Sequence, residues 1–176
     1  MDNSYIPLFG IMFAIFHELG HLIPIYLKSG KCLENKKISF GIVNIGIEND
    51  LFYDKNFDSN LVLISGPLIN FVLGIIFCSI YFFNKAEIIK IFSIQNFILC
   101  FINLLPITSF DGGKILYNIL SEKINPIFAY KCINFISIIF LVPLFTLGLF
   151  ILIKSKYNFS ILILGCYIIS YIFFKA

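Results

Sequence analysis

Two histidines and one glutamate lie in the segment FAIFHELGHLIPIY, residues 13–26, which is otherwise apolar. His17, Glu18 and His21 form the pattern H-E-x-x-H, in which imidazoles four positions apart share one helical face and can bind the same Zn²⁺. Glu18 lies about 100° round the helix from His17, so that it reaches a water beside the metal rather than the metal itself. The pattern predicts a metal site with a carboxylate that moves a proton.

Chance is a poor explanation for this arrangement. A histidine in a membrane helix ordinarily makes an interhelical hydrogen bond, and a glutamate there is ordinarily protonated and partnered. However, His17 and His21 are the two histidines of the chain, and Glu18 is the one glutamate inside its apolar runs. We therefore interpret the three residues as one site.

A catalytic zinc needs a third protein ligand and an open position for water. Because no histidine remains, the third ligand must be a carboxylate or a thiolate. Asp111, in INLLPITSFDGGKIL, is the best candidate, because the Gly-Gly turn after it lets the backbone approach another helix closely. Taken alone, Asp111 is better explained as a turn or N-cap acid, and only the histidine motif favours a ligand. Cys32 and Glu122 are the other candidates.

The composition indicates an integral membrane protein. Hydrophobic residues make up 59% of the 176 residues, charged residues 13%, and the mean hydropathy is +0.94. Soluble domains are roughly 45–50% apolar. The net charge of +3 is small and spread over loops, so nucleic acid is not an expected partner. The first apolar segment follows MDNSY without a basic region or a cleavage site, so we expect it to stay in the mature protein.

Five apolar runs are each long enough to cross a bilayer as a helix, at about 5–27, 60–83, 88–106, 127–153 and 158–174. The predicted fold class is an all-α membrane protein, a polytopic helical bundle of about five transmembrane helices. Pro106 should end the third span just before Asp111. Non-helical backbone within the hydrocarbon region of a membrane must be buried in protein or line a water-filled cavity.

Two connections are longer than the others. Residues 38–47 alternate Ile and Phe with small or polar residues, which predicts one or two short strands, a possible β-hairpin after the first helix. They either form a simple hairpin or pair with an extended substrate as an added strand. Residues 107–126 begin with a Gly-rich turn and should continue as a short amphipathic helix.

The cysteines show no C-x-x-C spacing, and most of them lie in apolar runs. We interpret them as small apolar residues of helices and expect no disulfide framework. They are Cys32, Cys78, Cys100, Cys132 and Cys166.

Three motifs together, HELGH, SGPLIN and NLLPITSFDGG, resemble the site-2 protease family of intramembrane zinc metalloproteases. They occur in the family's order over residues 6 to about 125, and the similarity is greatest to the sporulation branch, which processes a pro-sigma factor. The resemblance implies a metalloprotease core at 1–126 with two further helices at 127–176. This chain shows no helix before the H-E-x-x-H span, no PDZ domain and no CBS module, so regulation by ATP through such a module is not expected.

By this resemblance His17, His21 and Asp111 bind one Zn²⁺ per chain, and Glu18 is the general base and acid. The expected function is an intramembrane zinc metalloendopeptidase that cleaves a membrane-associated or transmembrane substrate in regulated intramembrane proteolysis, with a regulatory membrane partner possible. Substrate-side positions implied by the motifs are Gly66, Pro67, Asn70 and Asn103. Asn103 is equally explained by an amide that bonds a neighbouring helix.

Two other classes of function compete with this interpretation. A catalytically silent family member that binds a membrane partner is disfavoured because no motif position is degraded. A metal transporter is disfavoured because it needs further acidic or histidine residues along a path across the bilayer, and the apolar runs offer almost none.

The lysines predict the orientation in the cell membrane. Five spans place segments 28–59 and 107–126 and the C-terminus on one side, and the N-terminus and the tight turns on the other. By the positive-inside rule the lysine-rich side is cytoplasmic, so the active site opens to the cytoplasm and the N-terminus lies outside. The first side carries Lys28, Lys31, Lys36, Lys37, Lys55, Lys114, Lys123 and Lys175, and the other carries Lys85, Lys90, Lys154 and Lys156.

Overall fold

The structure of the protein is a computed structural model, and it describes residues 6–29, 38–40, 45–47 and 59–155. Within these ranges it has five helices and one pair of strands. The predicted span 158–174 and Cys32 lie outside the described residues. The chain divides into a first unit, Met1–Ile102, and a second unit, Asn103–Ala176. Each unit is described by itself.

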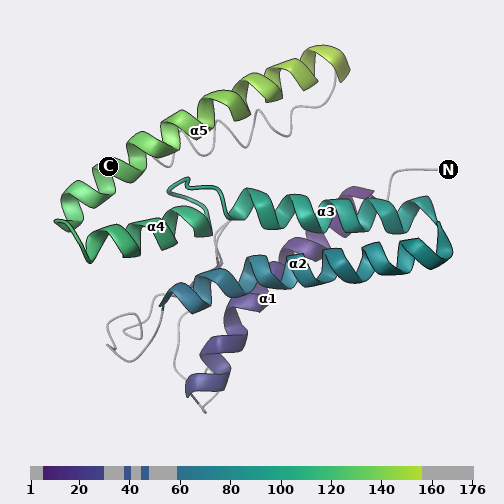
Figure 1. Cartoon of the computed structure of the whole chain (residues 1–176), viewed down its shortest axis with the longest axis horizontal. Helices are drawn as coiled ribbons and strands as arrows, with labels where there is room; N and C mark the ends of the chain where they lie inside the picture. Colours follow the sequence, from purple (N-terminus) through teal and green to yellow (C-terminus); the bar gives the residue numbers. More distant parts are fainter. Residues whose placement is uncertain (1–5, 30–37, 41–44, 48–58, 156–176) are drawn as a thin grey trace. The chain divides into compact units, whose positions relative to one another are not determined.

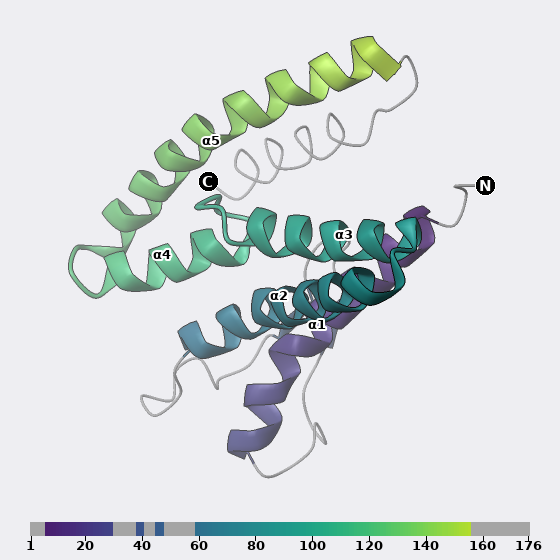
Figure 2. The same cartoon turned by 45° about the vertical axis from the view of Figure 1, so that its right-hand side comes forward.

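The first unit contains the helices α1 (Ile6–Ser29), α2 (Ser59–Asn84) and α3 (Glu87–Asn103), and the strands β1 (Ile38–Phe40) and β2 (Ile45–Ile47). The last residue of α3, Asn103, is counted with the second unit. The strands pair antiparallel, with Ile38 opposite Ile47, so the prediction of a short hairpin after the first helix is confirmed. Helices α2 and α3 run side by side in opposite directions in Figures 1 and 2. The turn between them is short because Lys85 adopts the left-handed conformation, with a φ of 51°.

One face of α1 is buried, and it carries Phe13, His17, Gly20 and Ile25. This spacing of three to five residues is the spacing that a helix needs to bury a single stripe. One turn before His17 on α1, the ring of Phe13 lies 5.6 Å from the ring of Phe77 on α2 and from that of Phe92 on α3, measured between ring centroids. These edge-to-face contacts join the three helices of the first unit.

Close to the histidines, α1 and α2 touch through their backbones. A Cβ atom on Gly20 would lie 2.9 Å from the Cα of Gly66 and 3.0 Å from the carbonyl oxygen of Ser65. Without an apolar driving force between helices in lipid, small residues that allow such close packing hold membrane helices together. The glycine pair therefore sets the distance at which α2 faces the histidines of α1.

The second unit is built on α4 (Asp111–Ser121) and α5 (Pro126–Ser155), which pack against each other. Between them Asn125 caps α5, since its Oδ1 accepts a hydrogen bond of 2.9 Å from the amide of Ile127. Pro126 then occupies the first helical position, where a missing N–H costs nothing. The short helix predicted within 107–126 is confirmed as α4.

Three described helical segments are long and apolar enough to cross a membrane: Leu8–Leu27, Ser59–Asn84 and Pro126–Phe150. Helix α3 has 17 residues and is therefore about 25 Å long, a little short of the ~30 Å hydrocarbon core. It ends at Asn103, ahead of Pro106 as expected. The predicted all-α membrane fold is confirmed, and large apolar side chains such as that of Phe83, 89% exposed, lie on its surface.

Candidate metal centre

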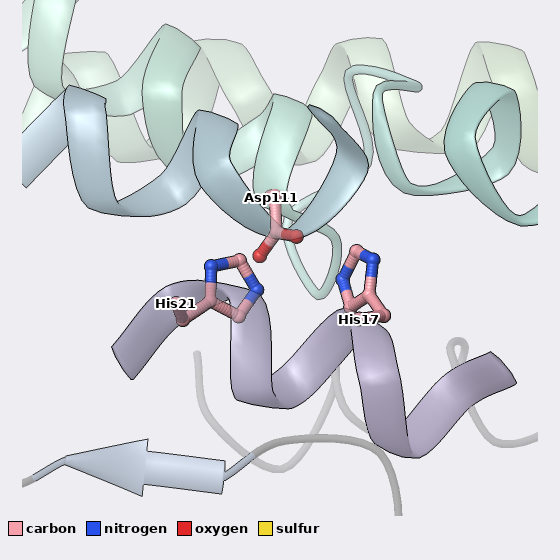
Figure 3. Close-up of side chains that lie close together, drawn as sticks. All are labelled: His17, His21 and Asp111. Atoms are coloured by element: carbon pink, nitrogen blue, oxygen red, sulfur yellow. The ribbon is translucent and has the colours of Figure 1, made fainter. Parts of the chain in front are cut away.

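His17 and His21 project from the same side of α1, one turn apart (Figure 3). Their ring centroids are 4.9 Å apart and the ring planes are nearly perpendicular, at 89°. His17 is 4% exposed and His21 is half-buried. Two imidazoles at this separation can direct one nitrogen each toward a common point.

A backbone carbonyl of α2 fixes the tautomer of His21. Its Nδ1 lies 2.7 Å from the carbonyl oxygen of Val62. A carbonyl oxygen only accepts hydrogen bonds, so Nδ1 carries the proton and donates it. In the neutral ring the Nε2 atom then holds the lone pair, which is the state that a metal-binding histidine requires.

Gly66 leaves the space in which the two rings lie. A Cβ atom on Gly66 would collide with Cε1 of His21 and would lie 2.5 Å from its Nε2 and 3.0 Å from Cε1 of His17. Real Cβ atoms essentially never come this close to their neighbours, so a larger residue at position 66 would have to displace His21. The neighbouring Pro67 is also buried in α2.

Asn70 lies one further turn along α2 and is fully buried. Its Nδ2 is 3.2 Å from Nδ1 of His17. Its Oδ1 is one of the buried polar atoms without a hydrogen-bond partner among the described residues. Asn70 therefore contacts a histidine of the motif, whereas the sequence predicted a position on the substrate side.

Glu18 is half-buried and follows His17 on α1. The helix turns it away from the histidine face by about 100°, which keeps the carboxylate out of line with the two imidazoles. This placement suits a group that exchanges protons with water rather than one that binds the metal.

In the second unit, Asp111 is the first residue of α4 and is 4% exposed. The N-cap of α4 is Phe110, which makes no side-chain capping hydrogen bond, so the alternative that Asp111 is the N-cap acid is wrong. Its Oδ1 lies 3.5 Å from Nζ of Lys114, a partly exposed side chain. A buried carboxylate requires such a partner or a metal, because an isolated charge is costly to bury.

The Gly-Gly pair after Asp111 allows the start of α4 to pack on the loop before it. A Cβ atom on Gly112 would collide with the carbonyl of Leu104, and one on Gly113 with the carbonyl of Ile107. The prediction that these glycines let the backbone approach another helix is wrong, because the backbone that they approach is that of their own loop. This packing fixes the position of the first turn of α4, and therefore that of the Asp111 side chain, relative to the loop before the helix.

A buried polar cluster on α5 holds the same loop. Thr108 donates from Oγ1 to Oδ1 of Asn134, at 2.9 Å, and its amide donates to Oγ of Ser137, at 2.9 Å. The oxygens of Thr108 and Ser137 are also within 2.8 Å. The sequence offered one signal, Asn134 and Ser137 spaced three apart in an apolar run, and that signal was not recognised.

The remaining residues named in the sequence analysis lie at helix ends or within helices. Asn103 is half-buried and ends α3, and its substrate contact stays a prediction. Glu122 is the exposed C-cap residue of α4. The described cysteines Cys78, Cys100 and Cys132 are free thiols in helices, in line with the expectation of no disulfide framework.

The donor groups suit zinc. Two imidazoles and one carboxylate are a common set for a catalytic Zn²⁺, with Nε2 bound and Nδ1 occupied by a fixed acceptor. The geometry at His21 already has this form, with Val62 as the acceptor.

Comparison with known proteins gives two matches. Residues 84–144, which include Asp111, match peptidase family M50. A zinc metalloprotease of Methanocaldococcus jannaschii is 29% identical over 147 residues, which cover 70% of this chain and 38% of that protein. The chain thus spans about two fifths of the length of this relative. No solved structure matches the chain.

Proposed function

We propose that the protein is an intramembrane zinc metallopeptidase of family M50, with His17, His21 and Asp111 as zinc ligands and Glu18 as general base. The observation that carries the proposal is the imidazole pair on α1, with ring centroids 4.9 Å apart and with Nδ1 of His21 donating to the carbonyl of Val62, which leaves Nε2 as the ligand atom of that ring. The family match, which includes Asp111, and the relative described as a zinc metalloprotease support it.

The third ligand is also supported by the burial of Asp111, which begins α4 and is 4% exposed. Its Oδ1 lies 3.5 Å from Nζ of Lys114, and a metal ion is the other kind of partner that stabilises a buried carboxylate.

When bound, Zn²⁺ supplies a Lewis acid that polarises a carbonyl and makes water a nucleophile at neutral pH. Glu18 accepts the proton of the attacking water and then passes it to the amine that leaves when the peptide bond breaks. His17 and His21 are held by α2 throughout, so neither ring has to reorient. The substrate backbone must be extended at the cleaved bond, because a helical peptide bond is shielded by its own hydrogen bonds.

The proposed substrate is a membrane-associated or transmembrane protein that is cleaved near the cytoplasmic face, as in regulated intramembrane proteolysis. The likeness to the sporulation branch makes a pro-sigma factor one such substrate. The chain acts inside the lipid bilayer, and a regulatory membrane partner is part of the proposal. The exposed apolar surfaces of α1, α2 and α5 support a site that is reached through the membrane.

The test of the enzymatic role is Glu18→Gln. This change keeps the size of the side chain and the zinc ligands but removes the base, so cleavage should fall by about 10² to 10⁴-fold while zinc content stays unchanged. New protein termini in membranes of cells expressing the wild type or the variant are compared by mass spectrometry. Identical termini in the two samples would favour the catalytically silent, partner-binding alternative.

The test of the ligand set is Asp111→Ala, measured by metal analysis of the purified protein. Two histidines alone bind zinc poorly, so occupancy should fall well below one Zn²⁺ per chain. Glu122→Ala is the matched control, since this acid ends the same helix and is exposed. Full occupancy in Asp111→Ala would remove Asp111 from the ligand set and lead to Cys32.

A further inference from the structure

Helix α2 presents a strip of three positions to the histidines, each one turn after the last. The carbonyl of Val62 holds Nδ1 of His21, Gly66 leaves room for both rings, and Asn70 meets Nδ1 of His17. The first contact fixes the tautomer that metal binding requires. The third contact does the same only if the carboxamide of Asn70 accepts a hydrogen bond.

We propose that Asn70 is a positioning residue for metal binding, and that its Oδ1 accepts the Nδ1 proton of His17 when Nε2 of that histidine binds the cation. This inference rests on the proposed function and adds a residue that acts through His17. Val62 and Asn70 then have matching roles, one for each imidazole.

Hydrogen-bond donors and acceptors decide the direction of this contact. An imidazole that binds a metal through Nε2 carries its proton on Nδ1, where it needs an acceptor. The carboxamide NH₂ group can only donate, so two donors would face each other across the 3.2 Å between Nδ2 of Asn70 and Nδ1 of His17. A turn of the carboxamide by 180° exchanges its nitrogen and oxygen at almost the same volume and puts Oδ1 opposite the proton.

Because Asn70 is buried, a carboxamide orientation that leaves its oxygen without a hydrogen bond is unfavourable. Asn70 has no exposed surface, and its Oδ1 has no hydrogen-bond partner in the orientation described above. A buried acceptor without a partner loses its hydrogen bonds to water and gains none in return, so it destabilises the fold. The unpaired oxygen is therefore available to turn toward His17, and the absence of exposed surface disfavours direct contact between Asn70 and a substrate.

The experiment measures Zn²⁺ affinity of detergent-purified protein by competition with a chelator, for the wild type and for Asn70→Leu. Loss of the group that orients a metal-binding histidine typically weakens metal binding by about 10 to 100-fold, and this is the expected result. Asn70→Asp keeps an acceptor at the same place and should retain affinity within about threefold of the wild type. Cobalt substitution adds a spectroscopic readout, since the visible absorption of Co²⁺ should change in Asn70→Leu and be restored in Asn70→Asp.

Asn96→Leu is the matched control. Asn96 on α3 is also fully buried, donates from Nδ2 to the carbonyl of Phe92 at 2.9 Å, and has an Oδ1 without a partner among the described residues. Among the described residues Asn96 makes no hydrogen bond to either histidine, so its replacement should leave zinc affinity unchanged.

Three results would overturn the proposal. Wild-type zinc affinity in Asn70→Leu removes the positioning role, and an equal loss in Asn96→Leu or Asn70→Asp shows a general effect of packing. If Asn70→Leu does not accumulate, Asn70→Ala and Asn70→Asp give the same comparison. A wild-type protein that binds no zinc would instead refute the proposed function itself, which separates the two failures.

Discussion

At the scale of single residues, the histidine pair depends on atoms that do not belong to the H-E-x-x-H motif. Burying an imidazole in a membrane protein is costly unless both ring nitrogens are satisfied. Val62 provides a carbonyl for His21, and Asn70 provides a carboxamide for His17. The two imidazoles come from the motif, whereas the groups that orient them come from α2.

Gly66→Ala should weaken zinc binding although it changes none of the proposed ligands. The added Cβ atom would lie 2.5 Å from Nε2 of His21, so the ring has to move or the two helices have to separate. We expect zinc affinity to fall by at least about tenfold, in the range seen when the orientation of a ligand is lost. Zinc titration of the purified variant measures this.

Gly10→Ala is the control for that substitution. Gly10 lies on α1, and a Cβ atom there would meet Nε2 of Gln95 at an ordinary 3.8 Å. Replacing a helical glycine by alanine at an open position stabilises the helix by about 0.5–1 kcal/mol, so this variant should bind zinc normally. Normal zinc binding by Gly66→Ala as well would show that the space around His21 is not restricted.

The H-E-x-x-H residues were easier to single out in the sequence than the residues that contact them. His17, Glu18 and His21 were found because their spacing is local and a helix places them at once. The contact between Asn70 and His17 joins positions 53 residues apart, and only the packing of α1 on α2 brings them together. SGPLIN was noted as a motif in the sequence. That its Gly66 leaves room for the two imidazoles and that its Asn70 contacts His17 can be seen only in the folded structure.

At the scale of elements, the loop between α3 and α4 is held by hydrogen bonds within itself and to α5. A loop this close to a membrane span must satisfy its own polar groups. Turns such as the 2.8 Å bond from the amide of Phe110 to the carbonyl of Ile107 satisfy some of them, and the cluster of Thr108, Asn134 and Ser137 satisfies others. Helix α5 therefore helps to position Asp111, three residues beyond Thr108.

Thr108→Val tests this support. Valine keeps the shape but removes the hydroxyl, which leaves Oδ1 of Asn134 without its donor. Interhelical hydrogen bonds in membrane proteins contribute about 0.6 kcal/mol on average and up to about 1.7 kcal/mol. We expect the apparent Tm to fall by about 2–4 °C and zinc affinity to weaken, as measured by thermal melting and zinc titration in detergent.

Thr146→Val on the same helix is the matched control. Thr146 is exposed, and its hydroxyl donates to the carbonyl of Pro143 at 2.9 Å within α5. Its loss should change stability by less than about 0.5 kcal/mol and leave zinc affinity unchanged. Equal effects of the two substitutions would assign the change to α5 alone rather than to the loop.

The helices were predicted to within a few residues where they are long and apolar. The expected runs 5–27 and 60–83 correspond to Ile6–Ser29 and Ser59–Asn84. The run 88–106 was extended too far, because apolar Leu104 and Leu105 lie in the irregular loop that precedes Pro106. Hydrophobicity measures burial in lipid or protein, so it does not mark where a helix ends.

At the scale of the whole molecule, the number of spans decides which compartment reaches the site. The described residues contain three segments that can span a membrane by length and composition, and α3 is only slightly shorter. Orientation is a separate question, and it depends on the lysines of the connecting segments. A cytoplasmic site implies cytoplasmic or membrane-embedded substrates.

The orientation prediction is tested with single cysteines in a background in which the native cysteines are replaced by serine. Asn35 lies outside the described residues, within the lysine-rich segment that the positive-inside rule assigns to the cytoplasm. Asn84 is exposed at the end of α2, beside Lys85 in the short turn that the same rule assigns to the outside. Asn35→Cys should resist an impermeant thiol reagent in intact cells and react after lysis, whereas Asn84→Cys should react in both. The opposite labelling pattern would show that the predicted orientation is wrong, and the proposed substrates would then lie on the other side of the membrane.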